Sequence, residues 1–268
     1  MADLIYKTAG DLPSQRKILL HGDSGAGKTR IGALAPSPII ILTEPNGLAT
    51  IQSANPDAMV VEATDLATVT RVLKDAAGGQ LTEKLGRKTL VLDSLTELQR
   101  MIRDDILATK SGGTFTLQDW GTLTDRTRKL IRLLRNVRMD ILAIALSQHE
   151  NEESTGVRHT TPMFEGRKIP NEIAGYFSAV GYVFKRYKAD ESNPDTKVVS
   201  HEVLFGGPQN ILTKTLPGLD SVEVPDMNVW LDKMQSVSGN TVTNGAEVVD
   251  IEPEKTTRRR RGRPAANK

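Results

Sequence analysis

Residues Lys17 to Thr29 read K-I-L-L-H-G-D-S-G-A-G-K-T, and the rest of the chain is best interpreted from this stretch. It fits the pattern G-x-x-x-x-G-K-[ST], with Gly22, Gly27, Lys28 and Thr29 at the fixed positions. The apolar run before Gly22 predicts a strand, and the segment after Thr29 is compatible with a helix. A strand, a glycine-containing loop and a helix in this order predict a phosphate-binding loop.

The chemistry of this loop follows from its residue types. Glycines let the backbone turn tightly and expose consecutive N–H groups, which cradle phosphate oxygens. Lys28 would reach the β- and γ-phosphates of a nucleotide, and the Thr29 hydroxyl would ligate Mg²⁺. We therefore expect ATP and Mg²⁺ as cofactors. The expected contact residues are Gly22, Asp23, Ser24, Gly25, Ala26, Gly27, Lys28 and Thr29.

Composition restricts the class of protein. The chain has 268 residues and no cysteine, which excludes disulfides and thiolate metal sites and fits a reducing compartment. Its N-terminus shows no apolar signal region, and the apolar runs at 39–42 and 141–146 are too short to span a membrane. We expect a cytoplasmic protein without a membrane partner.

Charge is distributed unevenly along the chain. Residues 255–268 hold seven basic residues and no acidic one, whereas residues 1–254 hold 28 basic and 33 acidic residues, a net charge of −5. Any nucleic-acid affinity of the body must therefore be local, while the terminal segment has its own. The arginines of this segment are Arg258, Arg259, Arg260, Arg261 and Arg263.

Strand and helix patterns alternate through the first 150 residues. Continuous apolar strands are predicted at 17–21, 38–43, 58–62, 88–93 and 140–146. Helices are predicted at 30–35, 46–54, 65–77, from 94 onward, and at 119–138. This alternation is typical of an α/β fold of the P-loop type, a mostly parallel twisted sheet with helices on both faces. Segments 179–188 and 197–205 read as an antiparallel extension of that sheet.

The predicted organisation has three parts. Residues 1–16 are a lead-in, residues 17–235 form the core, and residues 236–268 are a disordered linker and basic tail. Within the core, residues 150–168 show no period, so this segment is predicted to be a functional or disordered loop. Short helices are expected at 171–177, begun by Pro170, and at 226–234.

Two acidic residues end predicted strands, where a parallel sheet places its chemistry. Asp93 follows the run L-V-L and would hold Mg²⁺ through water. The next residue is Ser94 rather than glutamate, so the catalytic base must come from elsewhere. Glu44, which ends the second strand, is the candidate because its carboxylate could orient or deprotonate the attacking water. The alternative is a simple turn residue of the sequence E-P-N-G.

Other polar residues also have two interpretations. Gln148 ends the fifth strand, where it either contacts the γ-phosphate and signals to the following loop or bonds to backbone. Arg128, Arg132 and Arg135 share a helix face that is either solvated or a DNA track. The four histidines show no metal-binding spacing. Basic residues of the second half could reach a neighbouring subunit's nucleotide, and the sequence does not choose among Lys168, Lys185, Arg186 and Lys214.

Together these motifs resemble the RecA-type recombinase core. In that family the strand after the phosphate-loop helix ends in a catalytic glutamate, matched by I-I-I-L-T-E with Glu44. The metal-site strand ends in Asp-Ser, matched by L-V-L-D-S with Asp93. A later strand ends in a nucleotide-sensing glutamine that leads into a DNA-binding loop, matched by A-I-A-L-S-Q with Gln148. The resemblance covers roughly residues 17–231.

More narrowly, the chain is similar to short phage-encoded RecA-core ATPases of single-strand annealing and recombination, through D-S-L-T-E-L-Q-R, Q-D-W-G and I-P-N-E-I-A-G-Y-F. This resemblance implies a DNA-stimulated ATPase in the host cytoplasm that binds single-stranded DNA. It also implies a homo-oligomer or filament and partners such as single-strand-binding or other recombination proteins. We do not expect the large terminal domains of bacterial RecA, which favours a reduced role, such as binding or annealing single strands, over strand exchange.

The expected DNA contacts lie in two segments. In the loop after the fifth strand, Phe164 would stack on a base, beside the basic Arg158, Arg167 and Lys168. The terminal R-R-R-R-G-R-P, from Arg258 to Pro264, resembles a minor-groove hook built on Gly-Arg-Pro. A non-specific polybasic arm is the other interpretation.

Two further functions compete with a recombination ATPase. A P-loop assembly or helicase-loading factor would use ATP as a conformational ligand with negligible turnover. A nucleotide or small-molecule kinase would need a basic lid and an acceptor site, and the sequence shows neither. ATP turnover with and without single-stranded DNA separates the first two functions.

Overall fold

A nine-stranded sheet runs through the computed structural model, which describes residues 15–110, 114–166, 168–189 and 197–239. Its parallel strands, in spatial order, are β3 (Met59–Glu62), β2 (Pro38–Leu42), β4 (Thr89–Asp93), β5 (Asp140–Asn151), β1 (Lys17–Gly22) and β7 (Ala179–Ala189). The antiparallel strands β8 (Lys197–Leu204) and β9 (Val222–Glu223) extend the sheet beyond β7. The predicted α/β fold is confirmed, including its antiparallel end.

The central strands have continuous apolar runs, which allow both of their faces to be buried. In β2, Ile39 and Ile41 contribute to one hydrophobic cluster, whereas Ile40 and Leu42 contribute to the other. Successive strand side chains point to opposite faces of the sheet, so an unbroken apolar run supplies two cores.

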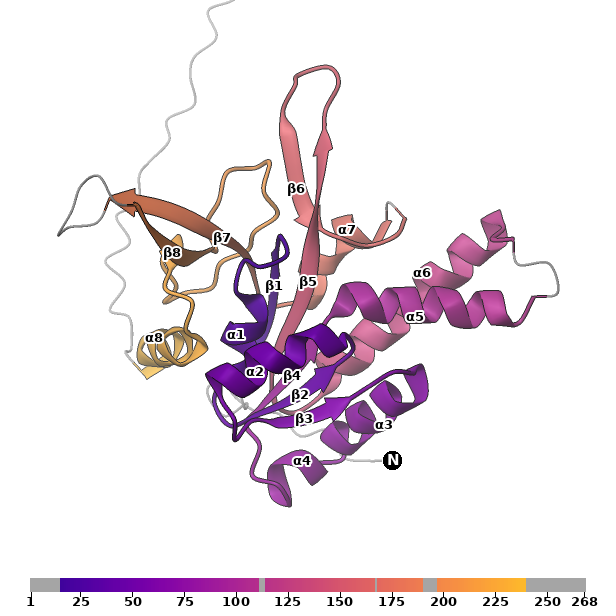
Figure 1. Cartoon of the computed structure of the whole chain (residues 1–268), viewed down its shortest axis with the longest axis horizontal. Coiled ribbons are helices and arrows are strands. Elements are labelled where there is room, and N and C mark those ends of the chain that lie inside the picture. Colours follow the sequence, from indigo (N-terminus) through magenta and orange to yellow (C-terminus); the bar gives the residue numbers. More distant parts are fainter. Residues whose placement is uncertain (1–14, 111–113, 167, 190–196, 240–268) are drawn as a thin grey trace, which may run out of the picture.

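Helices cover both faces of the sheet (Figure 1). The first hydrophobic cluster includes residues of α3 (Leu66–Ala77), α5 (Leu95–Ala108) and α6 (Leu117–Asn136). The second includes residues of α1 (Lys28–Ala33), α2 (Leu48–Ala54) and α8 (Met227–Gly239). The remaining short elements are η2 (Pro45–Gly47), α4 (Gln80–Glu83), α7 (Lys168–Glu172) and η3 (Ile173–Tyr176).

Local capping sets where the long helices begin. The Asp65 carboxylate accepts a hydrogen bond from the Thr68 backbone N–H at 2.7 Å, as predicted for the N-cap of α3. Helix α6 begins at Leu117, two residues before its predicted start, because Thr116 and Asp119 form a capping box. It ends at Asn136, ahead of the predicted end at 138.

The segment 150–168, predicted to lack regular structure, forms a hairpin and the start of a helix instead. Strand β5 continues to Asn151, and β6 (Arg158–Pro162) pairs with it in the antiparallel sense. Figure 1 shows this hairpin projecting beyond the rest of the sheet. Its residues are polar on both faces, so no hydrophobic alternation marks it in the sequence. Helix α7 begins at Lys168, before the predicted Pro170.

The described residues do not include Arg167, most of the lead-in, or the tail arginines Arg258, Arg259, Arg260, Arg261 and Arg263.

Among the helices of the described ranges, none has both the length and the apolar character required to cross a bilayer.

Candidate nucleotide-binding site

The predicted phosphate loop joins β1 to α1 and has the backbone that its glycines allow. Gly27 has φ of 102°, in the left-handed region that favours glycine. A Cβ atom on Gly22 would lie 2.5 Å from the carbonyl oxygen of Val183, so β7 packs directly against the start of the loop. Glycine is therefore required at these two positions for different reasons, a turn and a close backbone approach.

Lys28 folds back along the loop. Its Nζ donates hydrogen bonds to the carbonyl oxygens of Gly22 at 2.7 Å and Asp23 at 2.8 Å. Burial lowers the pKa of Lys28, and the nearby carboxylates of Asp93, Asp23 and Glu44 oppose that shift. The ammonium is held by neutral carbonyl groups at the loop, where a phosphate group could engage it.

Thr29 and Asp93 meet at the carboxyl end of β4. The Thr29 Oγ1 hydroxyl donates a hydrogen bond of 2.8 Å to Asp93 Oδ2. Burial raises the pKa of Asp93, while the Thr29 hydrogen bond acts against that rise. A hydroxyl and a buried carboxylate beside the phosphate loop are hard oxygen donors, which fit Mg²⁺ completed by nucleotide phosphates. These two residues would hold the metal.

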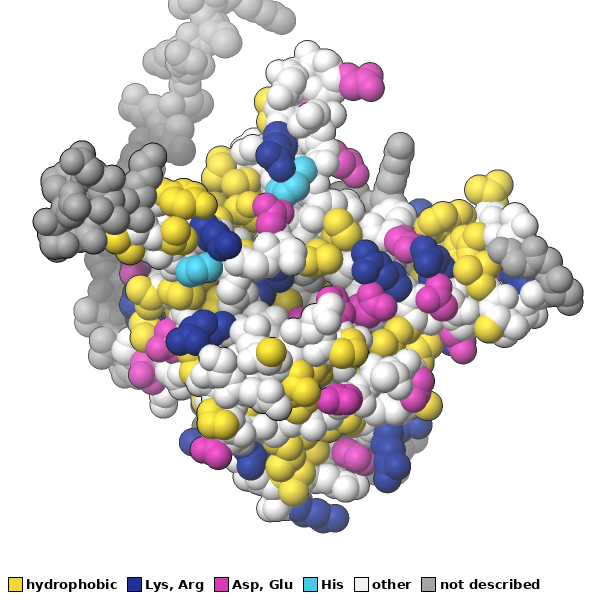
Figure 2. Space-filling model, in the orientation of Figure 1, with side chains coloured by type: hydrophobic (Ala, Val, Ile, Leu, Met, Phe, Trp, Pro, Cys, Tyr) yellow, Lys and Arg dark blue, Asp and Glu magenta, His cyan; other side chains and the backbone are white. Residues whose placement is uncertain are grey.

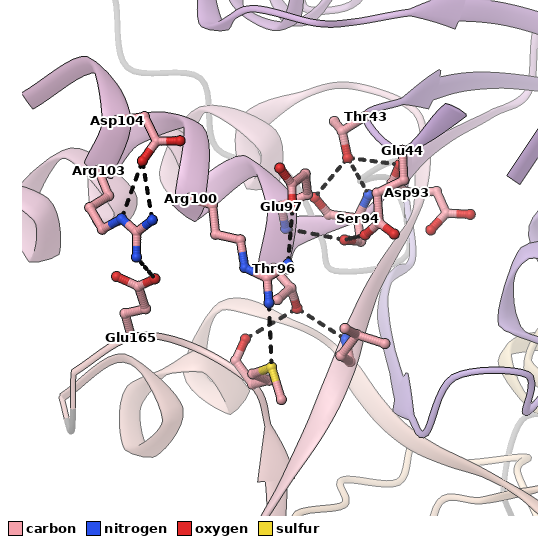
Figure 3. A network of polar contacts seen from close by, with 12 residues as sticks. Thr43, Glu44, Asp93, Ser94, Thr96, Glu97, Arg100, Arg103, Asp104 and Glu165 are labelled. Carbon is pink, nitrogen blue, oxygen red and sulfur yellow. Dashed lines mark hydrogen bonds and ion pairs between the residues drawn. The ribbon is translucent and has the colours of Figure 1, made fainter. Parts of the chain in front are cut away.

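Glu44 is tied to the end of β4 by the residue after Asp93. The Ser94 hydroxyl donates to Glu44 Oε1 at 2.9 Å and accepts from the Glu97 backbone N–H at 3.2 Å, which also caps α5. Thr43 joins the same strand ends, since its Oγ1 accepts from the Ser94 N–H at 2.8 Å. Figure 3 shows these side chains gathered at the ends of neighbouring strands. Glu44 also precedes the turn η2, so both predicted interpretations describe its position.

These groups border one cavity of about 420 Å³, within the range of small-molecule sites. The cavity is lined on one side by the phosphate loop and on the other by Glu44, Asp93 and Ser94. The structure therefore brings Lys28 to the same cavity as Glu44, Asp93 and Ser94, which are all distant from it in the sequence. The predicted sensor Gln148 is half-buried and pairs with Thr161 across the hairpin, outside the cavity lining.

A family model described as "AAA domain" matches residues 14–215, three quarters of the chain. The chain belongs to this AAA domain family. It is a P-loop ATPase domain, and this assignment is broader than the expected group of phage recombination ATPases. No curated protein matches the chain.

Among solved structures, the chain is similar to a prototypical ATPase from the type III secretion system of pathogenic bacteria. The identity is 17%, the TM-score is 0.41, and the match covers 62% of this chain and 51% of that one. The chain thus spans about half the length of that ATPase.

Histidines that the sequence did not single out surround the phosphate loop of this AAA domain. His149 Nε2 lies 2.8 Å from Asp23 Oδ1, and its Nδ1 lies 3.0 Å from Thr160 Oγ1 of β6. His201 of β8 donates from Nδ1 to the Ala26 carbonyl oxygen at 2.7 Å. The histidines have no metal-binding spacing in the sequence, and their contacts instead arise between distant strands. In the sequence, the best available clue to the contact of His149 with the phosphate loop was its position directly after Gln148, just beyond the predicted end of the fifth strand.

One predicted DNA contact is wrong. Phe164 is only 4% exposed and packs in the cluster beneath α5 and α6, so its ring cannot stack on a base from solvent. It follows the polar strand β6, and nothing local to the sequence distinguishes a ring that turns inward from one that turns outward. Arg158 and Lys168, by contrast, are exposed.

The arginine face of α6 is partly engaged in ion pairs. Arg128 donates from Nε to Glu172 at 2.8 Å and pairs with Asp125 at 3.2 Å, whereas Arg132 and Arg135 are exposed. Hydrogen bonding to Glu172 raises the pKa of Arg128 above its ordinary value. This arrangement favours the solvated-face interpretation over a DNA track.

Proposed function

We propose that this AAA domain binds and hydrolyses ATP and couples that cycle to single-stranded DNA. The proposed ATPase activity rests on one observation, which is that Lys28, the Thr29–Asp93 pair and Glu44 border the same cavity. A lysine, two oxygen donors and a carboxylate base are the groups that phosphoryl transfer to water needs.

The phosphate loop would bind the nucleotide first. Its N–H groups would cradle the phosphates, and Lys28 would exchange its two carbonyl partners for phosphate oxygens. Thr29 and Asp93 would hold Mg²⁺, which neutralises developing charge on the phosphates when bound. Because Asp93 is buried, a nearby cation would offset the cost of keeping its carboxylate charged.

Glu44 would act on the attacking water. Its carboxylate would accept a proton as the water oxygen bonds to the γ-phosphorus and the bond to the β,γ-bridging oxygen breaks. Ser94 keeps one Glu44 oxygen hydrogen-bonded, which leaves the other, Oε2, available for the water. Since Ser94 also caps α5, its hydroxyl is well placed to restrain the Glu44 rotamer.

The β5–β6 hairpin supports the proposed role in DNA binding. It projects from the carboxyl edge of the sheet and contacts the phosphate loop through His149 and Asp23. Figure 2 shows basic and histidine side chains on the hairpin close to the body and an acidic side chain near its tip. Arg158 and His159 are exposed there. We further propose a homo-oligomer, with recombination proteins as partners.

The same contact between loop and hairpin would also serve the competing function. In an assembly or helicase-loading factor, the nucleotide would reposition the hairpin and would not turn over. A favourable measurement must therefore include turnover as well as nucleotide binding.

Steady-state ATP hydrolysis by the full chain, with and without single-stranded DNA, tests this proposal. We expect turnover that rises with DNA, and its loss in Lys28→Ala because the cation on the β/γ-phosphates is removed. Undiminished hydrolysis by Lys28→Ala would refute the assignment of the phosphate loop. ATP binding without turnover in the wild type, with or without DNA, would instead support the assembly-factor function.

A further inference from the structure

The β7–β8 hairpin lies against the phosphate loop of its own chain. Strand β7 is paired with β1 from Ile18↔Ala179 to His21↔Tyr182. It then continues past the end of β1, so its next residues run alongside the loop. Lys185 stands three residues beyond Tyr182 and pairs with His201 of β8 across the hairpin.

His201 fastens this hairpin to the loop. Its Nδ1–H donates to the Ala26 carbonyl oxygen at 2.7 Å. Its ring also packs on Gly27, where an added Cβ atom would lie 3.1 Å from Nδ1. His201 is one of the residues lining the candidate nucleotide cavity. The hairpin is therefore part of the wall of that site.

Lys185 carries a free ammonium group to the middle of the loop. Its Nζ lies 3.8 Å from the position that a Cβ atom on Gly25 would occupy, and Gly25 lines the cavity. The side chain is exposed, and within the described part of the chain no hydrogen bond or ion pair engages it. Its neighbour Arg186 is different, since its Nε lies 3.0 Å from Glu202 Oε2.

Charge and reach make Lys185 a suitable phosphate ligand. Consecutive strand residues alternate between faces, so Lys185 and Arg186 point in opposite directions. A lysine ammonium is a compact point charge on a flexible four-carbon stem, and phosphate groups are its common partners. Gly25 has no side chain to stand between this ammonium and phosphates bound in the loop.

We propose that Lys185 is a nucleotide-binding residue that acts in cis, with its ammonium on the outermost phosphate of ATP held by the same chain. The hairpin then distinguishes a nucleoside triphosphate from a diphosphate, because only the triphosphate carries that group. This inference rests on the proposed binding of ATP at the phosphate loop.

The test compares Lys185→Gln with Arg186→Gln in the full chain, since both remove one positive charge from adjacent positions of β7. Affinities for a non-hydrolysable ATP analogue and for ADP are measured by titration calorimetry over a range of protein concentrations. For Lys185→Gln we expect affinity for the ATP analogue to fall by roughly ten-fold while affinity for ADP hardly changes, as for removal of one charge-assisted hydrogen bond. Arg186→Gln should leave the ratio of the two affinities unchanged, and Lys185→Arg should largely retain it.

The outcomes separate this inference from the proposed function. If Lys28→Ala loses nucleotide binding but Lys185→Gln keeps the wild-type affinity ratio, the role of Lys185 is wrong and the ATP site stands. If Lys28→Ala binds both nucleotides as the wild type does, the proposed function itself is wrong. An effect of Lys185→Gln that appears only at concentrations where the protein assembles would overturn action in cis, because the ammonium would then serve a neighbouring chain.

Discussion

His21, the residue directly before the phosphate loop, should make the stability of this protein sensitive to mild acid. The side chain is fully buried. Its Nε2–H donates to the Leu212 carbonyl oxygen at 2.7 Å, so its Nδ1 accepts from the Ser147 hydroxyl at 2.9 Å. Burial lowers the pKa of His21 from 6.5 to about 4, with the Leu212 hydrogen bond opposing the shift and the positive charge of Lys28 adding to it.

The sign and size of the effect follow from proton linkage. Between pH 6.5 and pH 4 the unfolded chain binds a proton at His21 that the folded chain does not bind, so the free energy of unfolding falls as the pH falls. Across this whole pH range the free energy of unfolding decreases by roughly 3 kcal/mol. Between pH 7 and pH 5 the decrease is about 2 kcal/mol, a large share of the stability of an ordinary domain.

The measurement is urea unfolding at pH 7 and pH 5, followed by tryptophan fluorescence, to which the fully buried Trp230 and the exposed Trp120 both contribute. His21→Gln keeps an amide that can donate to Leu212 and accept from Ser147, but it cannot titrate. We expect the wild type to lose about 2 kcal/mol more than His21→Gln between the two pH values. His159→Gln, at an exposed histidine, should behave as the wild type does. Equal decreases in wild type and His21→Gln would refute the reasoning.

Two further predictions concern catalysis and DNA. Glu44→Gln should retain ATP binding but slow hydrolysis by on the order of 10²-fold or more, because the amide cannot accept the proton of the attacking water; single-turnover kinetics measure this. Deletion of residues 255–268 should weaken DNA binding and flatten the dependence of log affinity on log salt by roughly 0.7 to 0.9 for each DNA phosphate that the tail had neutralised. DNA-independent hydrolysis should be unaffected, and salt titrations of DNA binding give the slope.

Each of these has a result that would contradict it. Unchanged turnover in Glu44→Gln would return this residue to its role at the turn. An unchanged salt slope after the deletion would refute the idea of a DNA-binding arm. Equal binding of the intact protein to A·T-rich and G·C-rich duplexes would remove only the minor-groove hook.

Much of the candidate site was predictable because parallel sheets obey a simple geometric rule. The carboxyl ends of parallel strands meet at one edge, so polar residues that end separate apolar runs come together there. Asp93 and Glu44 were found in this way, and the phosphate loop by its residue pattern. The Ser94 hydroxyl between them was not, because a bond between the ends of two strands depends on which strands are neighbours and on side-chain rotamers.

The β5–β6 hairpin and Phe164 show where this reasoning stops. A half-buried strand is recognised in a sequence by its apolar face, and in this hairpin the buried positions include the polar residues Ser147 and Thr160. Its backbone pairing is therefore visible only in the folded chain. The inward turn of Phe164 is likewise set by a space beneath α5 and α6 that distant segments create.

By itself, the sequence determined the fold class, the phosphate loop and the acidic residues at the strand ends, because each depends on local pattern or on a rule of sheet topology. Only the tertiary structure decided what surrounds that loop. It placed β7 beside β1 and so brought Lys185 and His201, both far away in the chain, to the loop's outer side. Such contacts have no local pattern, since they result from the order in which strands pack within the sheet.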